Sequence, residues 1–323
     1  MSKFKVLIAD DLSKKAVEIL TSHPEITVEV KTGLKGAELA AAVKGAHAIA
    51  VRSAAKVTAE VVEAADVLKI VGRAGAGVDT IDVPACSKKG VLVVNTPGGN
   101  SITTAEHALF LLFSLARHIP QATASVKAGK WEKKKFTGTE LYGKTLGVVG
   151  FGAIGKIVAD RAIGMKMKVV AFDPIASAEA AAAIGAELVS IDELYRRSDC
   201  ISVHAPLIAE TKGLIGDAAF AKMKKGVLMV NCARGGIVDE AAAKKALDDG
   251  TLAGLALDVF VEEPPPADHP LLSHERVICT PHIGASSNEA QERVAVEIAE
   301  QIAAYLLHGE IGHAVNRDAV AKR

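Results

Sequence analysis

The feature that most constrains this chain is a glycine-rich turn near its middle, set between two apolar runs. The first run, residues 146–149, enters a G-x-G-x-x-G turn at Gly150, Gly152 and Gly155, and a helical pattern then extends to residue 164. The second run, residues 168–172, ends at Asp173. Strand, turn, helix, strand and acid, in this order, form the signature of a dinucleotide site. The glycines allow, in turn, a tight bend, the approach of a pyrophosphate to the backbone, and close packing of helix on strand.

Asp173 indicates which dinucleotide is bound. A carboxylate at this position accepts hydrogen bonds from both ribose hydroxyls and repels a 2′-phosphate, so the sequence predicts NAD rather than NADP. The start of the helix offers free N–H groups and a positive dipole end to the phosphates. The alternative is a glycine-rich loop that binds nothing, which the ordered context of the motif disfavours.

Length and composition set the class of protein. A chain of 323 residues is long for one domain, so we expect two. Half of the residues are hydrophobic, few are aromatic, and Ala and Val are abundant, which is typical of helices packed on parallel strands. The formal net charge is zero, so nothing in the bulk charge indicates nucleic acid or an acidic membrane as a partner.

The cysteines and the N-terminus indicate a soluble, cytoplasmic protein. Cys86, Cys200, Cys232 and Cys279 show neither a C-x-x-C pair nor a metal-ligand spacing, so we expect buried thiols in a reducing compartment and no metal site. The chain starts directly with a predicted strand, without the long apolar region of a signal peptide. No apolar stretch reaches the ~20 residues that a membrane span requires.

The rest of the chain alternates between predicted strands and helices, which favours parallel sheets with ligands beyond the carboxyl ends of the strands. In the first hundred residues, Arg52, Arg73 and the turn at 95–100 follow such strands. Later strands end at residues 204–207, 232–236, 262–266 and 281–285. The apolar residues of the helix at 101–116 nearly encircle it, so it must be buried by more than one neighbour, and we expect it to contribute a subunit contact.

Six motifs together resemble one enzyme family. They are GRAGAGVD, NTPGGNS, GFGAIG, VNCARGGIVDE, ALDVFVEEP and TPHIGA, in this order. The chain resembles the D-isomer-specific 2-hydroxyacid dehydrogenases over essentially its whole length. The resemblance implies an α/β fold with two doubly wound parallel-sheet domains. A Rossmann NAD domain, residues 98–285, is inserted into a flavodoxin-like substrate domain, residues 1–97 plus 286–323. It also implies an active site in the cleft between them and either a homodimer or a tetramer.

Some stretches are most similar to one branch of this family. NSITTAEHALFLL and VNCARGGIVDE look like the members that oxidise 3-phospho-D-glycerate to 3-phosphohydroxypyruvate, the first step of serine biosynthesis. The chain has no room for the regulatory C-terminal domains of the longer members, so it is either a short form or a truncated one. Two other functions stay open: reduction of hydroxypyruvate or glyoxylate on the same chemistry, and an NAD-sensing corepressor-like binding protein.

The resemblance also implies the catalytic residues. His282 is the expected acid/base, because a neutral imidazole can take up the hydroxyl proton near pH 7. Glu263 is expected to hold the other ring nitrogen and stabilise the imidazolium. Arg234 is expected to bind the substrate carboxylate through its planar fork. His204 remains an alternative base, and Glu262 an alternative partner.

Further residues are implied as ligands of the substrate or the cofactor. Arg52 and Arg73 are expected to bind the substrate phosphate, with surface ion pairs as the alternative. For the whole substrate we expect Arg52, Arg73, Gly75, Asn100, Lys133, Arg234 and His282. For Lys133 two alternatives stay open, namely charge supplied from the partner subunit and a solvated basic turn. For NAD we expect Ala76, Gly150, Gly152, Ala153, Ile154, Gly155, Asp173, Pro174, Ala205, Pro206, Cys232, Ala233, Arg234, Asp258, His282, Gly284 and Ala285.

One position departs from the family pattern. Many members carry a cation at the position of Ala153, where it can reach the pyrophosphate. Here the backbone N–H groups of Ala153 and Ile154 must suffice, so we expect NAD binding to be weaker by ~1 kcal/mol, the order of an exposed ionic contact.

Overall fold

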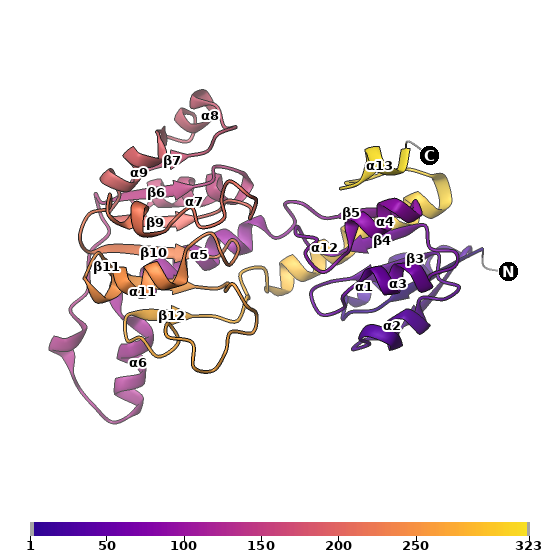
Figure 1. Cartoon of the computed structure of the whole chain (residues 1–323), viewed down its shortest axis with the longest axis horizontal. Coiled ribbons are helices and arrows are strands. Elements are labelled where there is room, and N and C mark those ends of the chain that lie inside the picture. Colours follow the sequence, from indigo (N-terminus) through magenta and orange to yellow (C-terminus); the bar gives the residue numbers. More distant parts are fainter. Residues whose placement is uncertain (1–2, 322–323) are drawn as a thin grey trace. The chain divides into compact units, whose positions relative to one another are not determined.

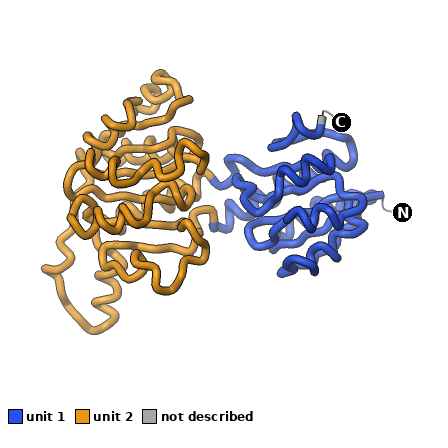
Figure 2. Tube along the Cα trace, viewed as in Figure 1, with its two compact units in different colours: residues 1–100, 286–323 blue, residues 101–285 orange. Residues whose placement is uncertain are grey.

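The protein, described here by a computed structural model of residues 3–321, divides into two compact units. One unit contains the residues up to Asn100 together with those from Ser286 onward, and the other is Ser101–Ala285 (Figure 2). The sequence predicted a division after residue 97, whereas the contacts place it after Asn100. Each unit contains one parallel sheet, and the second is inserted within the first, so the predicted fold class is confirmed.

The sheet of the first unit has five strands in the order β2-β1-β3-β4-β5. All neighbouring strands pair in parallel. This is the flavodoxin-like strand order. The strands are β1 (Phe4–Ile8), β2 (Ile26–Val30), β3 (Ala48–Val51), β4 (Ile70–Arg73) and β5 (Leu92–Asn95).

Helices cover both faces of this sheet. Side chains alternate along a strand, so Val6 and Ile8 pack with one set of helices and Leu7 with the other. The first set is α1 (Lys14–Thr21) and α12 (Asn288–His308), and the second is α2 (Gly36–Ala42), α3 (Ala59–Ala64) and α4 (Val83–Lys89). The returning chain is thus part of the core, and after it the amide side chain of Asn316, just before α13 (Arg317–Ala321), bonds to the backbone of Val91 and Val93.

The sheet of the second unit has seven strands in the order β12-β11-β10-β9-β6-β7-β8, again all parallel (Figure 1). Counted from β6, this contains the Rossmann order 3-2-1-4-5-6. The strands are β6 (Thr145–Val149), β7 (Lys168–Phe172), β8 (Glu187–Leu188), β9 (Cys200–Val203), β10 (Val227–Asn231), β11 (Leu252–Leu257) and β12 (Val277–Cys279).

Two groups of helices enclose the second sheet. One core forms with α5 (Ser101–Arg117), α7 (Ala153–Gly164) and α8 (Ala178–Ala182). The other forms with α9 (Ile191–Arg197), α10 (Asp217–Phe220) and α11 (Glu240–Asp248). Outside these layers follow α6 (Ile119–Lys127) and the short 3₁₀ helix η1 (Lys133–Phe136). Each helix of the described residues is too short or too polar to cross a bilayer.

Sequence reasoning missed five of these elements: α4, α6, η1, α13 and β8. The signals for α4 are nevertheless in the sequence, because Asp82 caps its first turn, Pro84 lies at its start and Gly90 ends it in the left-handed conformation. β8 has only two residues, which is too short for an alternating pattern to be recognised.

Gly72 in β4 offers a test of how α12 completes the first unit. A Cβ atom at Gly72 would lie 2.7 Å from Cδ1 of Ile302 and 2.8 Å from Cγ1 of Ile298. We expect Gly72→Val to lower the free energy of unfolding by about 1–3 kcal/mol through overpacking, measured by urea denaturation followed by circular dichroism. Adding Ile302→Ala to the same chain makes room and should recover part of the loss. An unchanged unfolding midpoint in Gly72→Val would contradict this packing.

Candidate active site

The glycine-rich turn lies at the carboxyl end of β6, where its glycines have different roles. Gly150 has a φ of +93°, and a Cβ there would lie 2.7 Å from the backbone of His204 and Ala205. A Cβ at Gly155 would overlap the carbonyl oxygen of Gly150. At Gly152 a Cβ would meet no described atom within 4 Å. Packing within the unit therefore requires the first and third glycines, whereas the second leaves open space at the start of α7.

Asp173 follows β7 and ties its end to this turn. One carboxylate oxygen accepts the N–H of Phe151 at 2.7 Å, and the other accepts the N–H groups of Ile175 and Ala176 at 2.8 and 3.1 Å. A carboxylate has about four lone-pair sites, so capacity remains for a ribose hydroxyl. The acid thus has a structural role that sequence reasoning did not foresee.

These residues fit a dinucleotide. The N-cap of α7 is Gly152, which makes no side-chain capping bond, so the N–H groups of the first turn at Ala153 and Ile154 face the open space left by that glycine. Pro174 follows Asp173 after β7, and Ala205 and Pro206 follow His204 after β9, where the backbone of Ala205 lies against Gly150. The surroundings offer backbone donors for a pyrophosphate and an acid for a ribose.

His282 and Glu263 form a close pair at the same edge of the sheet. Nδ1 of His282 lies 2.6 Å from Oε2 of Glu263, and the N–H of Phe260 donates to Oε1 of Glu263 at 3.0 Å. The carboxylate is therefore held from both sides. The side chain of His282 is 47% exposed, so a substrate can reach it. The structure pairs the ring with Glu263, and Glu262 is exposed beside it.

Arg234 is attached to this pair through the backbone. The side chain of Asn231, at the end of β10, accepts the N–H of Ala233 and donates to the carbonyl of Arg234, both at 3.0 Å. A Cβ at Gly235 would overlap the carbonyl of Phe260, the residue whose N–H holds Glu263. The loop carrying Arg234 therefore lies against the segment that carries Glu263.

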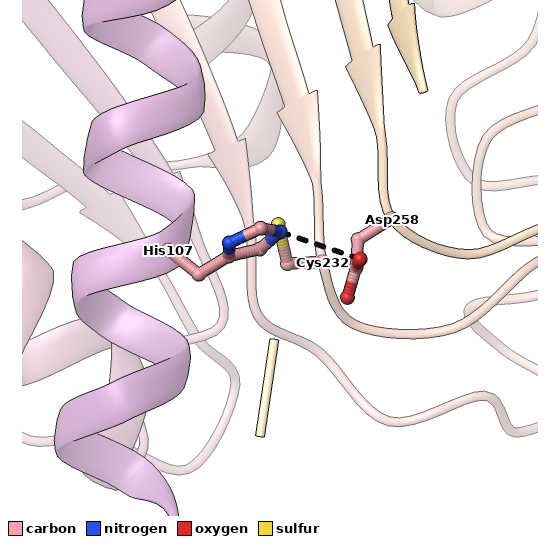
Figure 3. A group of neighbouring side chains, drawn as sticks. All are labelled: His107, Cys232 and Asp258. Atoms are coloured by element: carbon pink, nitrogen blue, oxygen red, sulfur yellow. Dashed lines mark ion pairs between the residues drawn. The ribbon is translucent and has the colours of Figure 1, made fainter. Parts of the chain in front are cut away.

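A buried network adjoins the loop of His282, and sequence reasoning missed one of its members. Figure 3 shows His107 of α5 beside Cys232 and Asp258. Asp258 accepts the hydroxyl of Thr280 at 2.6 Å, and the N–H groups of Ile283 and Gly284 at 2.8 and 2.7 Å. Burial alone would raise the pKa of Asp258, but hydrogen bonds from His107, Thr280 and the two amides outweigh it and lower that pKa.

The same three side chains have ligand atoms within 4.8 Å of one another, which is compatible with a metal ion. The bonds of Asp258 argue for a hydrogen-bonded network instead. Oδ1 of Asp258 already accepts the hydroxyl of Thr280 and the N–H of Ile283, and Oδ2 accepts the N–H of Gly284. Cys232 and Asp258 were both predicted to contact NAD, and their place is the interior next to the loop of His282.

His204, the alternative base, is held inside the unit. Its Nε2 lies 2.7 Å from the hydroxyl of Ser202, and its Nδ1 is buried. Burial lowers the pKa of His204 to about 4. An exposed ring paired with a carboxylate is the better acid/base, so the geometry favours His282.

The predicted cations of the first unit lie together at one edge of its sheet. Val51 pairs with Arg73 across β3 and β4, and Nε of Arg73 donates to the carbonyl of Arg52 at 3.3 Å. The buried carboxylate of Asp10 holds the N–H of Arg52 at 2.6 Å. Gly75 lies directly against the guanidinium of Arg73, since a Cβ there would overlap it.

The contacts of the remaining predicted residues do not indicate which ligand each residue would bind. The carbonyl of Ala76 accepts the side-chain amide of Asn95 at 2.5 Å, and Oδ1 of Asn100, the last residue of this half of the first unit, is buried. In the second unit, Lys133 is exposed in η1 and Ala285 ends the loop after His282. No described contact brings Lys133 to the His282 pair.

Comparison with known proteins identifies relatives of the whole chain. Residues 109–284 match the family described as D-isomer specific 2-hydroxyacid dehydrogenase, NAD binding domain. The chain is 53% identical over 298 residues to D-3-phosphoglycerate dehydrogenase of Archaeoglobus fulgidus, which covers 92% of this chain and 56% of that protein. It spans about half the length of the curated relatives that it matches.

Two solved structures are similar over their full length. The TT0316 protein of Thermus thermophilus has a TM-score of 0.88 and 34% identity, covering 97% of this chain and 100% of that one. D-lactate dehydrogenase of Aquifex aeolicus, complexed with NAD and lactic acid, has a TM-score of 0.83 and 28% identity, covering 96% and 99%.

The contrast between Gly152 and Gly155 predicts two separable defects. We expect Gly155→Ala to lower the melting temperature, because its Cβ overlaps the carbonyl of Gly150. Gly152→Ala should fold like the wild type but bind NAD at least about tenfold more weakly, since its Cβ occupies the path of the pyrophosphate. Thermal unfolding and calorimetric titration with NAD measure the two effects. Wild-type NAD affinity in Gly152→Ala would contradict the assignment of the site.

Proposed function

Because the chain belongs to the D-isomer-specific 2-hydroxyacid dehydrogenase family, we propose that it oxidises 3-phospho-D-glycerate to 3-phosphohydroxypyruvate with NAD. The observation that carries the proposed chemistry is the pair of His282 and Glu263, whose side chains meet at 2.6 Å. The choice of substrate is supported by the identity of about half of the aligned residues to D-3-phosphoglycerate dehydrogenases.

His282 handles the proton of the substrate hydroxyl. Glu263 accepts the hydrogen on Nδ1, which leaves the lone pair on Nε2 free to take that proton. When the proton has moved, the carboxylate stabilises the imidazolium. When bound, the nicotinamide accepts the hydrogen on C2 with its electron pair, so the alcohol becomes a ketone.

Arg234 binds and orients the substrate. Its guanidinium presents a planar fork that matches a carboxylate and polarises the C2 oxygen. The bonds of Asn231 on both sides of Ala233 keep the loop of Arg234 in place. The loop of Arg234 packs at Gly235 against the segment that carries Glu263, and Glu263 in turn pairs with His282 from a third loop.

The phosphate of the substrate requires further cations. Arg52 and Arg73 meet this need, because they lie at the ends of neighbouring strands of one sheet and Nε of Arg73 donates to the carbonyl of Arg52. A reductase acting on glyoxylate or hydroxypyruvate would need neither charge, so these two residues separate the first function from its alternative.

We further propose that the chain forms a homodimer through α5, α6 and the segment after them. Large apolar side chains are exposed along this stretch of the second unit, with Phe110 63% and Trp131 85% exposed. The whole set is Ile102, Phe110, Ile119, Val126 and Trp131. The thiols of Cys86, Cys200 and Cys232 are buried as predicted, whereas Cys279, at the end of the edge strand β12, is exposed, so the prediction of a buried thiol is wrong there. The three buried thiols fit a reducing, cytoplasmic compartment.

The acid/base pair is tested by two amide substitutions. His282→Gln should lower kcat by about 10²–10⁴-fold, because glutamine cannot take the hydroxyl proton. Glu263→Gln should lower kcat by at least about tenfold, since a neutral amide does not stabilise the imidazolium. Steady-state absorbance of the reduced nicotinamide measures both. The matched control is Glu262→Gln, whose kcat is expected within about twofold of the wild type. A loss of kcat in Glu262→Gln but not in Glu263→Gln would contradict the pairing of His282 with Glu263.

The substrate is tested with a panel of phosphorylated and unphosphorylated 2-hydroxy acids, using NAD and NADP. Arg52→Ala should lower kcat/KM for 3-phosphoglycerate by about 10- to 100-fold, the cost of a lost hydrogen bond to a charged group. The same variant should treat glycerate like the wild type. Lys35→Ala, which removes an exposed cation elsewhere in the first unit, is the control. Equal wild-type activity on glycerate and 3-phosphoglycerate would overturn the phosphate assignment.

A further inference from the structure

The loop that carries His282 has an unusual backbone held by one buried carboxylate. His282 has a φ of +54°, a left-handed conformation that residues other than glycine rarely adopt. The next two N–H groups, of Ile283 and Gly284, both donate to Asp258. A Cβ at Gly284 would lie 2.9 Å from Oδ2 of Asp258, so glycine is needed for this approach. The hydrogen bonds from these two N–H groups to Asp258 therefore fix the backbone conformation of His282.

Thr280 provides the second attachment of the same loop. Its hydroxyl donates to Oδ1 of Asp258 at 2.6 Å, and its carbonyl accepts the N–H of His282 at 3.0 Å. Both ends of the turn around His282 thus bond to the side chain of Asp258, which is 1% exposed.

His107 reaches this anchor from a distant helix. Its Nε2 lies 3.1 Å from the hydroxyl oxygen of Thr280 and 3.3 Å from Oδ1 of Asp258 (Figure 3). The hydrogen of the Thr280 hydroxyl is already donated to Asp258, so that oxygen can only accept from His107. Nε2 of His107 therefore carries a hydrogen, and the ring acts as a donor to the centre of the network.

We propose that His107 is a positioning residue for the acid/base His282. It fixes Thr280 and Asp258 by donating from α5, and these in turn fix the turn that presents His282 to the substrate. The inference rests on the proposed role of His282. His107 takes no part in proton transfer, since its Nε2 is directed into the network and its side chain is 18% exposed.

Three substitutions test this role. His107→Leu keeps the volume and removes the donor, and Thr280→Val removes the bridging hydroxyl. Each should lower kcat by about 10- to 100-fold, with KM and the NAD dissociation constant within about threefold of the wild type. His107→Gln retains an N–H at a similar reach and should recover kcat to within about threefold of the wild type. The double variant His107→Leu/Thr280→Val should lose less than the product of the single losses, because both act through Asp258.

The pH profile separates positioning from proton transfer. We expect kcat/KM of His107→Leu to fall at every pH while its midpoint stays that of the wild type. A shifted midpoint would overturn the inference, because it would make His107 part of the titrating machinery. Equal losses in His107→Leu and His107→Gln would also overturn it, since packing alone would then be responsible, as would weakened NAD binding with an unchanged kcat.

A parallel measurement distinguishes failure of this inference from failure of the proposed function. His282→Gln is assayed on whichever 2-hydroxy acid the chain turns over fastest. If that variant keeps most of its kcat, the proposed base is wrong. If it is inactive while His107→Leu is unimpaired, the base stands and the positioning role of His107 is wrong.

Discussion

At the carboxyl edge of the second sheet, backbone segments approach one another so closely that only glycine fits at the points of contact. Gly155 meets the carbonyl of Gly150, Gly150 meets the backbone after β9, and Gly235 meets the carbonyl of Phe260. The first contact closes one turn, and the other two join loops that follow different strands, because the carboxyl ends of parallel strands share one edge. The loops can therefore be set relative to one another by backbone contact, which is stiffer than contact through side chains.

Two carboxylates near this edge have opposite environments and correspondingly different roles. Asp258 is buried, and hydrogen bonds from its own unit keep it ionised against the cost of burial. Glu263 is partly exposed and held by one N–H, so its other oxygen is available to His282. Asp258 fixes the backbone after His282, and Glu263 pairs with the ring of His282, the proposed acid/base. Separation of the two tasks allows His282 to be reachable and still ordered.

The amino-acid sequence was sufficient for the fold class and for the cofactor, because both depend on local patterns. Glycine spacing, apolar runs and the acid after β7 are all read within 30 residues. The adjacency of Arg52 and Arg73 also follows from a local rule, since parallel strands in register bring their ends together. His107 could not be found in this way. It lies 173 positions before Thr280. In the sequence it is one of several polar residues on a mostly apolar helix. Only the packing of α5 on the sheet brings it to the network.

The described contacts of Arg52 and of the pair of His282 and Glu263 lie within their own units. Arg52 depends on Asp10 and Arg73 on the carbonyl of Arg52, all within the first unit. His282, Glu263 and Arg234 depend on bonds and contacts within the second unit. Arg52 and His282, whose described partners lie in different units, are therefore expected to show additive effects in free energy when both are substituted. We therefore expect a substitution at Arg52 to alter the preference for a phosphorylated acid while the pairing of His282 with Glu263 is preserved.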